Sequence, residues 1–279
     1  MKVTAVIEDF SGIGNMSMLT ALDILHAVNI TTAALPATVL STQSEGFGQP
    51  AVMNLSTVHQ FQKQTLMHWG RVANMQITNI LLGYLGDLST IDSVSHWLHC
   101  QHNIFTIIDP VMGDQGSLYP GLNQNIPYKM RQLILNASVI TPNLTELKLL
   151  SGLFTEKNYD IKDYIDALRD LGYFNDCIIT GIPKDQMIVS EYWSKDNKLV
   201  DRYQTKRLTG HFYGTGDVFS ALFAAFVNIG LPKQKAFIQA NQLLTTAIQE
   251  TSVLPEEDRK YGLLMHDLLQ KLSYYKIRK

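Results

Sequence analysis

Short apolar segments recur along the chain and alternate with longer amphipathic ones. The short segments are rich in Ile, Val and Leu, and none of them alternates cleanly between apolar and polar positions. Continuous apolar runs of this kind are typical of strands that are buried on both faces of a parallel sheet. They predict strands at Val3–Ile7, Thr78–Leu82, Ile104–Ile108, Ser138–Thr141 and Cys177–Thr180.

The segments between these strands carry the spacing of amphipathic helices. They predict helices at Met16–Val28, Val58–Trp69, Ile91–His99, Gln124–Asn136, Leu144–Leu150 and Tyr159–Leu171. Strands that alternate with helices form βαβ units, whose right-handed crossovers place helices on both faces of the sheet. The pattern therefore predicts a three-layer α/β fold with a mainly parallel central sheet.

The pattern changes after residue 180. Met187–Trp193 and Leu199–Gln204 flank a turn-rich segment, which predicts a β-hairpin. Further helices are predicted at Val218–Asn228, Lys233–Gln249 and Leu263–Leu272. No repeat, low-complexity tract or linker interrupts the chain, so we expect residues 1–279 to form a single domain.

Composition excludes several classes of protein. The chain has 279 residues, 46% of them hydrophobic, and a formal net charge of −2, which excludes disorder and bulk-charge binding to nucleic acid. No apolar run is long enough to span a membrane. Cys100 and Cys177 form neither a disulfide framework nor a metal spacing, which favours a reducing compartment. We therefore expect a cytoplasmic protein with no nucleic-acid or membrane partner.

The strongest candidate for chemistry is Gly214-Thr215-Gly216-Asp217, directly before an apolar helix. Glycines allow a close approach of the backbone, and amides at a helix N-terminus form an anion site. A carboxylate repels phosphate, so Asp217 in such a site would serve to accept a proton from an attacking hydroxyl. The alternative is an Asp that caps the helix on a glycine-rich turn.

Two acidic residues follow the Ile104–Ile108 strand in Asp109-Pro110-Val111-Met112-Gly113-Asp114. Ligands of open α/β sheets bind beyond the carboxyl ends of the strands, and carboxylates there can hold Mg²⁺. The alternative is that Asp109 and Asp114 only stabilise a turn.

A third motif, Thr141-Pro142-Asn143-Leu144-Thr145-Glu146, lies where the next strand meets a helix. Asn143 can cap that helix, and Glu146 stands at nearly the spacing of a capping box. Asn143 and Glu146 could also face the same cleft as Asp109.

Weaker motifs exclude other chemistry. Gly12-Ile13-Gly14 follows the first strand but lacks the third glycine of a dinucleotide fingerprint, and no P-loop motif occurs. His96, His99, Cys100 and His102 crowd one helix end without a second ligand cluster, so a solvated helix end is favoured over zinc.

Together these motifs resemble the ribokinase superfamily, and within it the pyridoxal kinases of the vitamin-kinase branch. The resemblance extends from Asp9 to the helix after Asp217, and it implies a ribokinase-like fold, ATP and Mg²⁺ as cofactors, and a homodimer. It implies that Asp217 is the catalytic base and that Gly214, Thr215 and Gly216 form an anion hole.

The resemblance also implies the remaining site residues. It places adenine near the loops that flank the Leu231–Gln249 helix, while His211 could close over the site or lie on the surface. Mg²⁺ would be held through water by Asp109 and Glu146. The implied nucleotide and substrate residues are Asp109, Tyr119, Thr141, Asn143, Glu146, Thr180 and Gly181 for ATP, and Asp9, Ser11, Tyr84 and Asp217 for the small-molecule substrate.

Two segments depart from the pyridoxal kinase pattern. Asp9-Phe10-Ser11-Gly12 resembles the hydroxymethylpyrimidine kinases, and Thr42-Gln43-Ser44-Glu45 replaces the Ser-Asn-His-Thr loop of pyridoxal kinases. The pyrimidine kinases generally carry Cys where this chain has Asp217. We therefore expect ATP-dependent phosphorylation of the 5′-hydroxymethyl group of pyridoxal, pyridoxine or pyridoxamine. The alternatives are a hydroxymethylpyrimidine kinase of thiamine synthesis and a non-catalytic vitamin-binding regulator.

Overall fold

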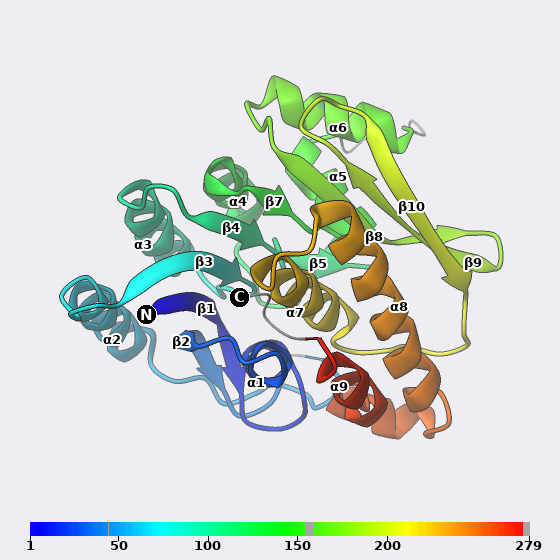
Figure 1. Ribbon diagram of the computed structural model, residues 1–279, viewed down its shortest axis with the longest axis horizontal. Helices are drawn as coiled ribbons and strands as arrows, with labels where there is room; N and C mark the ends of the chain where they lie inside the picture. The colour runs from blue at the N-terminus through cyan, green and yellow to red at the C-terminus, as the bar shows by residue number, and fades with distance from the viewer. Residues whose placement is uncertain (44, 154–158, 276–279) are drawn as a thin grey trace.

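A computed structural model describes residues 1–43, 45–153 and 159–275. Within these residues, eight strands form a central sheet in the order β10-β9-β8-β7-β4-β3-β1-β2 (Figure 1). The strands are β1 (Lys2–Ser11), β2 (Thr32–Leu40), β3 (Gln76–Leu82), β4 (Phe105–Ile108), β7 (Val139–Ile140), β8 (Asp176–Lys184), β9 (Met187–Trp193) and β10 (Leu199–Lys206). In this sheet order, neighbouring strands from β8 to β2 pair in parallel. At the other edge, β9 and β10 form the predicted antiparallel hairpin. Ser44 of the predicted substrate loop lies outside the described residues.

Helices cover both faces of the sheet, which confirms the three-layer α/β prediction (Figure 1). Successive residues of β1 point to opposite cores, Val6 to one and Ile7 to the other. This explains why the strands show no apolar alternation, since both faces are buried. One layer contains α1 (Ser17–Ala27), α7 (Thr215–Asn228), α8 (Lys233–Thr251) and α9 (His266–Leu272). The other contains α2 (Leu55–Trp69), α3 (Leu88–His99), α4 (Ile126–Leu133), α5 (Leu144–Ser151) and α6 (Ile161–Asp170).

The sequence pattern did not predict strand β2. This strand carries Pro36 at its centre, where it pairs in register with Glu8 of β1. Proline cannot donate a ladder hydrogen bond and is tolerated in edge strands, and β2 is the edge strand of this sheet. The proline masks the strand in the sequence pattern, and the strand is recognised only from its pairing with β1.

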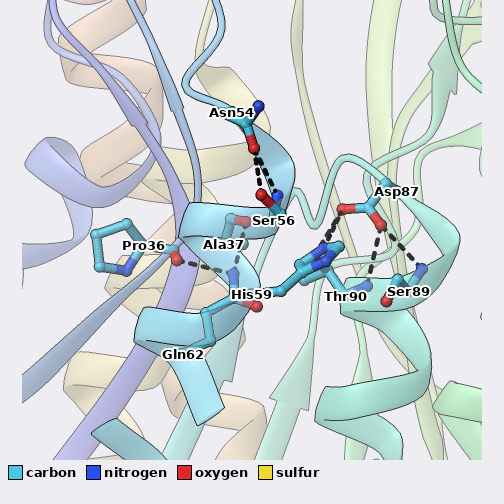
Figure 2. Close-up of polar contacts among 9 residues, drawn as sticks. All are labelled: Pro36, Ala37, Asn54, Ser56, His59, Gln62, Asp87, Ser89 and Thr90. Atoms are coloured by element: carbon cyan, nitrogen blue, oxygen red, sulfur yellow. Dashed lines mark hydrogen bonds and ion pairs between the residues drawn. The ribbon is translucent and has the colours of Figure 1, made fainter. Parts of the chain in front are cut away.

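Helix α2 is attached to this edge strand by a polar contact. Among its residues only Val58 and Gln62 are buried. The Gln62 Nε2 donates hydrogen bonds to the carbonyl oxygens of Pro36 (3.1 Å) and Ala37 (2.7 Å), as Figure 2 shows. The buried amide of Gln62 therefore ties this helix to the edge strand, beside the packing of Leu66 and Trp69 against the core.

Several short elements complete the fold. β5 (Gly113–Asp114) and β6 (Ser117–Leu118) form a small antiparallel hairpin after β4. The helix that was predicted to reach Asn136 ends in a 3₁₀ turn (Ile134–Asn136). A second 3₁₀ turn spans Glu256–Tyr261.

The described part of the chain contains no group of three or more His, Cys, Asp or Glu side chains that could hold a metal ion. His99 instead lies with its Nδ1 2.6 Å from Asn136 Oδ1 at the end of α3, in keeping with a helix end. None of the helices in the described ranges has both the length and the apolar character of a membrane span.

Candidate active site

A cavity of about 1030 Å³ opens beyond the carboxyl ends of the parallel strands. Its wall includes Asp9 from β1, Tyr84 after β3, Asp109 after β4, Thr141 after β7 and Thr180 from β8. Parallel strands end at the same edge of a sheet, so residues far apart in the sequence meet there.

Almost all of the predicted site residues line this one cavity. Ser11 does not, but its Oγ donates a 2.7 Å hydrogen bond to Asp9 Oδ2 and so supports a residue that does. The predicted residues that line the cavity are Asp9, Tyr84, Asp109, Tyr119, Thr141, Asn143, Glu146, Thr180, Gly181, Gly214, Thr215, Gly216 and Asp217.

Asp217 lies in the first turn of α7, which begins three residues earlier than the sequence predicted. Gly214 is the N-cap, with a φ of 76° that favours glycine, and Thr215 and Gly216 follow within the helix. The first amides of α7 have no partner within the helix, and they lie at the cavity wall. Asp217 is therefore not the capping residue, and its carboxylate stands beside a group of amides suited to a phosphoryl group.

The Asp217 carboxylate is partly buried and hydrogen-bonded. Its Oδ2 accepts from the Ser17 backbone N–H at 2.8 Å and from Ser17 Oγ at 3.4 Å. Burial raises the pKa of Asp217, and the hydrogen bonds from Ser17 oppose that rise. A raised pKa suits a group that must accept a proton near neutral pH.

Asp109 is held by a short chain of hydroxyl groups. Ser220 Oγ donates to Asp109 Oδ2 at 2.7 Å, and Thr141 Oγ1 lies 2.9 Å from Ser220 Oγ. Ser220 is a site residue that the sequence motifs did not predict. Its position could have indicated this role, because Ser220 follows Asp217 by three residues on α7 and therefore lies on the same face of the helix.

Asn143 and Glu146 form a capping box at the start of α5 and also face the cavity. Asn143 Oδ1 accepts from the Glu146 N–H, and Glu146 Oε2 accepts from the Asn143 N–H, each at 2.9 Å. Glu146 Oε1 also accepts from the Met112 N–H at 3.2 Å, and Asn143 Nδ2 donates to the Gly113 carbonyl at 2.8 Å. The capping and cleft interpretations are therefore both correct, since the cap fixes these side chains against the loop that follows β4.

Asp109 and Glu146 have the properties of a site for a hard cation. Burial raises the pKa of Asp109 to about 7, with Asp217 adding to the rise, and burial followed by the charge of Asp109 raises the pKa of Glu146. No salt bridge to a described Lys, Arg or His neutralises either carboxyl group. Mg²⁺ commonly binds through one or two carboxylates, water and phosphate oxygens, so these two residues fit it.

The far end of the cavity, between α8 and the β9–β10 hairpin, combines apolar side chains with polar ones such as Ser190, Asn241 and Thr245. Ile188 of β9 and Tyr203 of β10 face Leu244 and Ile248 of α8 across it. Leu244 and Ile248 belong to the helix whose flanking loops are predicted to lie near adenine, and that position stays a prediction.

Three basic residues that the sequence analysis missed also line the cavity: Lys148, Lys206 and Arg207. They supply positive charge within a cavity otherwise rich in carboxylates, where a polyphosphate would need it. Their signal was weak, because the chain has no overall excess of basic residues.

At the opposite end of the cavity, near the carboxyl ends of β1 and β3, the wall carries buried polar groups. Burial raises the pKa of Asp9 to about 6, although hydrogen bonds from Ser11 and Ser17 lower it, and burial raises the pKa of Tyr84 to about 12. Behind Asp9, Glu8 is buried against Gly83, where a Cβ would lie only 2.4 Å from Glu8 Oε2. Gly83 thus makes room for a buried carboxyl group next to the site.

His211 lies in the cavity wall. Its Nε2 is 3.9 Å from Glu45 Oε2, and its ring packs edge-on against Tyr213 with 4.2 Å between centroids. Of the two predicted positions, the structure places His211 at the cavity and not on a remote surface.

Known proteins resemble this chain over nearly its full length. A family model described as phosphomethylpyrimidine kinase matches residues 32–260. The pyridoxal kinase of Lactobacillus plantarum is 34% identical, with 97% of this chain and 96% of that chain covered and a TM-score of 0.87. A Bacteroides thetaiotaomicron structure described as a phosphomethylpyrimidine kinase with pyridoxal is 28% identical, covers 97% and 95%, and has a TM-score of 0.85.

Curated relatives divide between two substrates. The hydroxymethylpyrimidine/phosphomethylpyrimidine kinase of Staphylococcus aureus is 25% identical over 275 residues, covering 95% of this chain and 93% of the relative. Other relatives, from Schizosaccharomyces pombe and Caenorhabditis elegans, are matched over only 40% and 49% of their own length, at 32% and 31% identity. These last two relatives are described as pyridoxal kinases, so the chain is similar to proteins described as pyridoxal kinases and to one described as a hydroxymethylpyrimidine/phosphomethylpyrimidine kinase.

Proposed function

The chain belongs to the phosphomethylpyrimidine kinase family, within the ribokinase-like fold, and on that premise we propose that it phosphorylates pyridoxal. The γ-phosphoryl group of ATP would pass to the 5′-hydroxymethyl group of pyridoxal, pyridoxine or pyridoxamine, as in vitamin B6 salvage. The observation that carries the proposal is the carboxylate of Asp217 beside the free amides of α7, at the wall of a large cavity.

Asp217 is the proposed general base. Its carboxylate accepts the proton of the hydroxymethyl group as that oxygen attacks the γ-phosphorus in line. The amides of Gly214 through Asp217 stabilise the charge of the transferring phosphoryl group, and one such preorganised donor contributes about 3–4 kcal/mol in other enzymes. When bound, Mg²⁺ neutralises the phosphate oxygens, and Asp109 and Glu146 would hold it through water.

The two ends of the cavity suit the two substrates. Asp9, which Ser11 supports, accepts a hydrogen bond from the edge of the vitamin ring, and Tyr84 packs beside the ring. At the other end the apolar wall between α8 and the β9–β10 hairpin takes adenine. Tyr119, Asn143, Thr180 and Gly181 line the path of the triphosphate, where Lys148, Lys206 and Arg207 add positive charge. A homodimer, implied by the family resemblance, is part of the proposal, and light scattering measures it directly.

Hydroxymethylpyrimidine kinase activity is the second candidate. Asp9-Phe10-Ser11-Gly12 and the Staphylococcus aureus relative favour it. Asp217 favours pyridoxal, because the pyrimidine branch generally carries Cys at that position. A non-catalytic vitamin-binding regulator is the third candidate, but it would have no use for a base at an anion site.

A coupled assay of ADP release separates these candidates. The purified protein is supplied with Mg²⁺, ATP and one acceptor at a time: pyridoxal, pyridoxine, pyridoxamine or hydroxymethylpyrimidine. We expect the highest kcat/KM with a B6 vitamer. Faster turnover of the pyrimidine would support the second candidate, and no ADP above background with any acceptor would support the regulator.

Asp217→Asn tests the base itself. The amide keeps the shape and can still accept from Ser17, but it cannot take a proton. We therefore expect kcat to fall about 10²–10⁴-fold while ATP binding, measured by calorimetry, is retained. Turnover of pyridoxal close to that of the wild type would refute the assignment.

A further inference from the structure

One motif from the sequence has no role in the mechanism described so far: the glycine-containing loop that leads into α1. The loop ends at Ser17, whose N–H and Oγ both lie within hydrogen-bond distance of Asp217 Oδ2, at 2.8 and 3.4 Å. In the described residues, Ser17 supplies all the hydrogen bonds that the Asp217 carboxylate accepts. The proposed base is thus oriented by a residue 200 positions away in the sequence.

The backbone of Ser17 is unusual for a residue with a side chain. Ser17 is the first residue of α1, yet its φ is +46°, in the left-handed region. A non-glycine residue holds this conformation only where the surroundings enforce it. Here the conformation directs both donors of Ser17 at one carboxylate oxygen, and Ser17 is 8% exposed.

The preceding loop is held in place from the opposite end of the chain. The Asn15 N–H donates to the Tyr261 carbonyl at 2.8 Å. At Gly14 (φ +91°), a Cβ would lie 2.8 Å from that carbonyl oxygen, and at Gly262 (φ +95°), a Cβ would lie 2.5 Å from the Asn15 carbonyl oxygen. Neither glycine position can accept a side chain without moving the loop.

The surroundings of Asp217 require such a donor. The carboxyl groups of Glu8 and Asp9 on β1 and of Asp109 after β4 all face Asp217 closely enough for its charge to raise their pKa values. Repulsion among these groups would displace an unsupported carboxylate. The Ser17 hydroxyl also lowers the pKa of Asp9, so it stands near both the residue proposed to bind the vitamin ring and the proposed base.

We propose that Ser17 is a positioning residue, whose hydroxyl and left-handed backbone hold Asp217 toward the acceptor hydroxyl. The inference rests on the proposed function, because it assigns Asp217 the role of base. The loss of a hydrogen bond to a charged group typically changes a rate about tenfold or more.

The experiment measures kcat and the KM values for ATP and pyridoxal in Ser17→Ala. This variant keeps the backbone N–H but loses the hydroxyl, so we expect kcat to fall about tenfold while the KM for ATP stays within twofold. The control is Asn29→Ala, which places alanine at another left-handed residue (φ +61°), one that is exposed and lies just past the other end of α1, and it should leave kcat unchanged.

A double-mutant cycle shows whether Ser17 acts through Asp217. In the Asp217→Asn background, Ser17→Ala should have no further effect on the residual rate, because the group that it positions is gone. Equal fold-losses in both backgrounds would overturn the inference. So would a kcat for Ser17→Ala within twofold of the wild type.

Gly262→Ala supplies an independent variant that leaves Ser17 intact. The added Cβ would push on Asn15 and shift Ser17 away from Asp217, so we expect the same selective loss of kcat, with the fold checked by circular dichroism. An unchanged kcat in folded Gly262→Ala would overturn the role of the clamp. A wild-type protein inactive with all four acceptors would overturn the proposed function, and this inference with it, whereas an active wild type with an unaffected Ser17→Ala overturns this inference alone.

Discussion

Carboxyl groups gather at one edge of the sheet: Glu8, Asp9, Asp109 and Glu146 are almost inaccessible to solvent, and Asp217 beside them is partly buried. Each is more costly to ionise there than in water, because burial removes hydration and neighbouring charges repel. Such an arrangement lowers the stability of the unliganded protein, and it is typical of sites that bind cations and move protons. Function and stability therefore compete at these residues.

Asp9 offers a test of this competition at a single residue. Its pKa is raised to about 6 from an unperturbed 3.8, mainly by burial. The folded state thus holds the proton more tightly than the unfolded chain, so the stability contribution is complete below pH 4 and is lost as the pH rises through 6. We expect unliganded Asp9→Asn to be about 2 kcal/mol more stable than the wild type at pH 8, because Asn cannot ionise yet still accepts from Ser11.

Urea unfolding at pH 8 and at pH 4.5 measures this difference, which should shrink greatly at the lower pH. Asp23→Asn, which removes an exposed charge on α1, is the matched control. A gain of equal size at both pH values would show that ionisation of Asp9 is not its cause.

At the level of elements, local signals identified most helices and strands but not their attachments. Helix α2 illustrates this, because its apolar spacing predicts a helix but says nothing of how it is fixed. In the structure, His59 of α2 lies with Nε2 3.3 Å from Asp87 Oδ2 and 3.1 Å from Thr90 Oγ1, at the start of α3 (Figure 2). Gln62 of α2 also donates to carbonyl oxygens of β2, so polar contacts tie α2 to both β2 and α3.

Gln62→Ala should detach this helix in part. The substitution leaves the carbonyls of Pro36 and Ala37 without their buried donor, and an unsatisfied buried group costs about 1–3 kcal/mol. We expect a loss of that size in the free energy of unfolding, with kcat little changed because the cavity lies elsewhere. Gln60→Ala, an exposed position on the same helix, is the control, and an equal loss in both variants would contradict the role given to Gln62.

At the scale of the molecule, the cavity joins segments from the whole length of the chain, from Asp9 to Glu256. A ligand that contacts α5, α7, α8 and the β9–β10 hairpin at once should stabilise the fold as a unit. Binding at 100 times the dissociation constant stabilises a protein by about 2.7 kcal/mol.

Mg²⁺ and ATP together should therefore raise the Tm by about 5 °C, as differential scanning fluorimetry measures. Removal of Mg²⁺ with EDTA should reduce this shift and abolish turnover, because phosphate oxygens would then face the carboxylates of Asp109 and Glu146 directly. The shift caused by pyridoxal alone should not depend on EDTA. An ATP shift that is the same with and without Mg²⁺ would argue against a metal site at Asp109 and Glu146.

The amino-acid sequence by itself determined the features that depend on neighbours along the chain. The apolar runs predicted most of the parallel strands, the Asn143–Glu146 spacing predicted a capping box, and Gly214–Asp217 marked a helix start, because each needs only local backbone geometry. The tertiary structure decided the contacts between residues far apart in the sequence. These are the pairing of Pro36 in an edge strand, the hydrogen bond from Ser220 to Asp109, and the hydrogen bond from Ser17 to Asp217. The order of strands in the sheet brings these partners together, and hydrophobic periodicity does not specify that order.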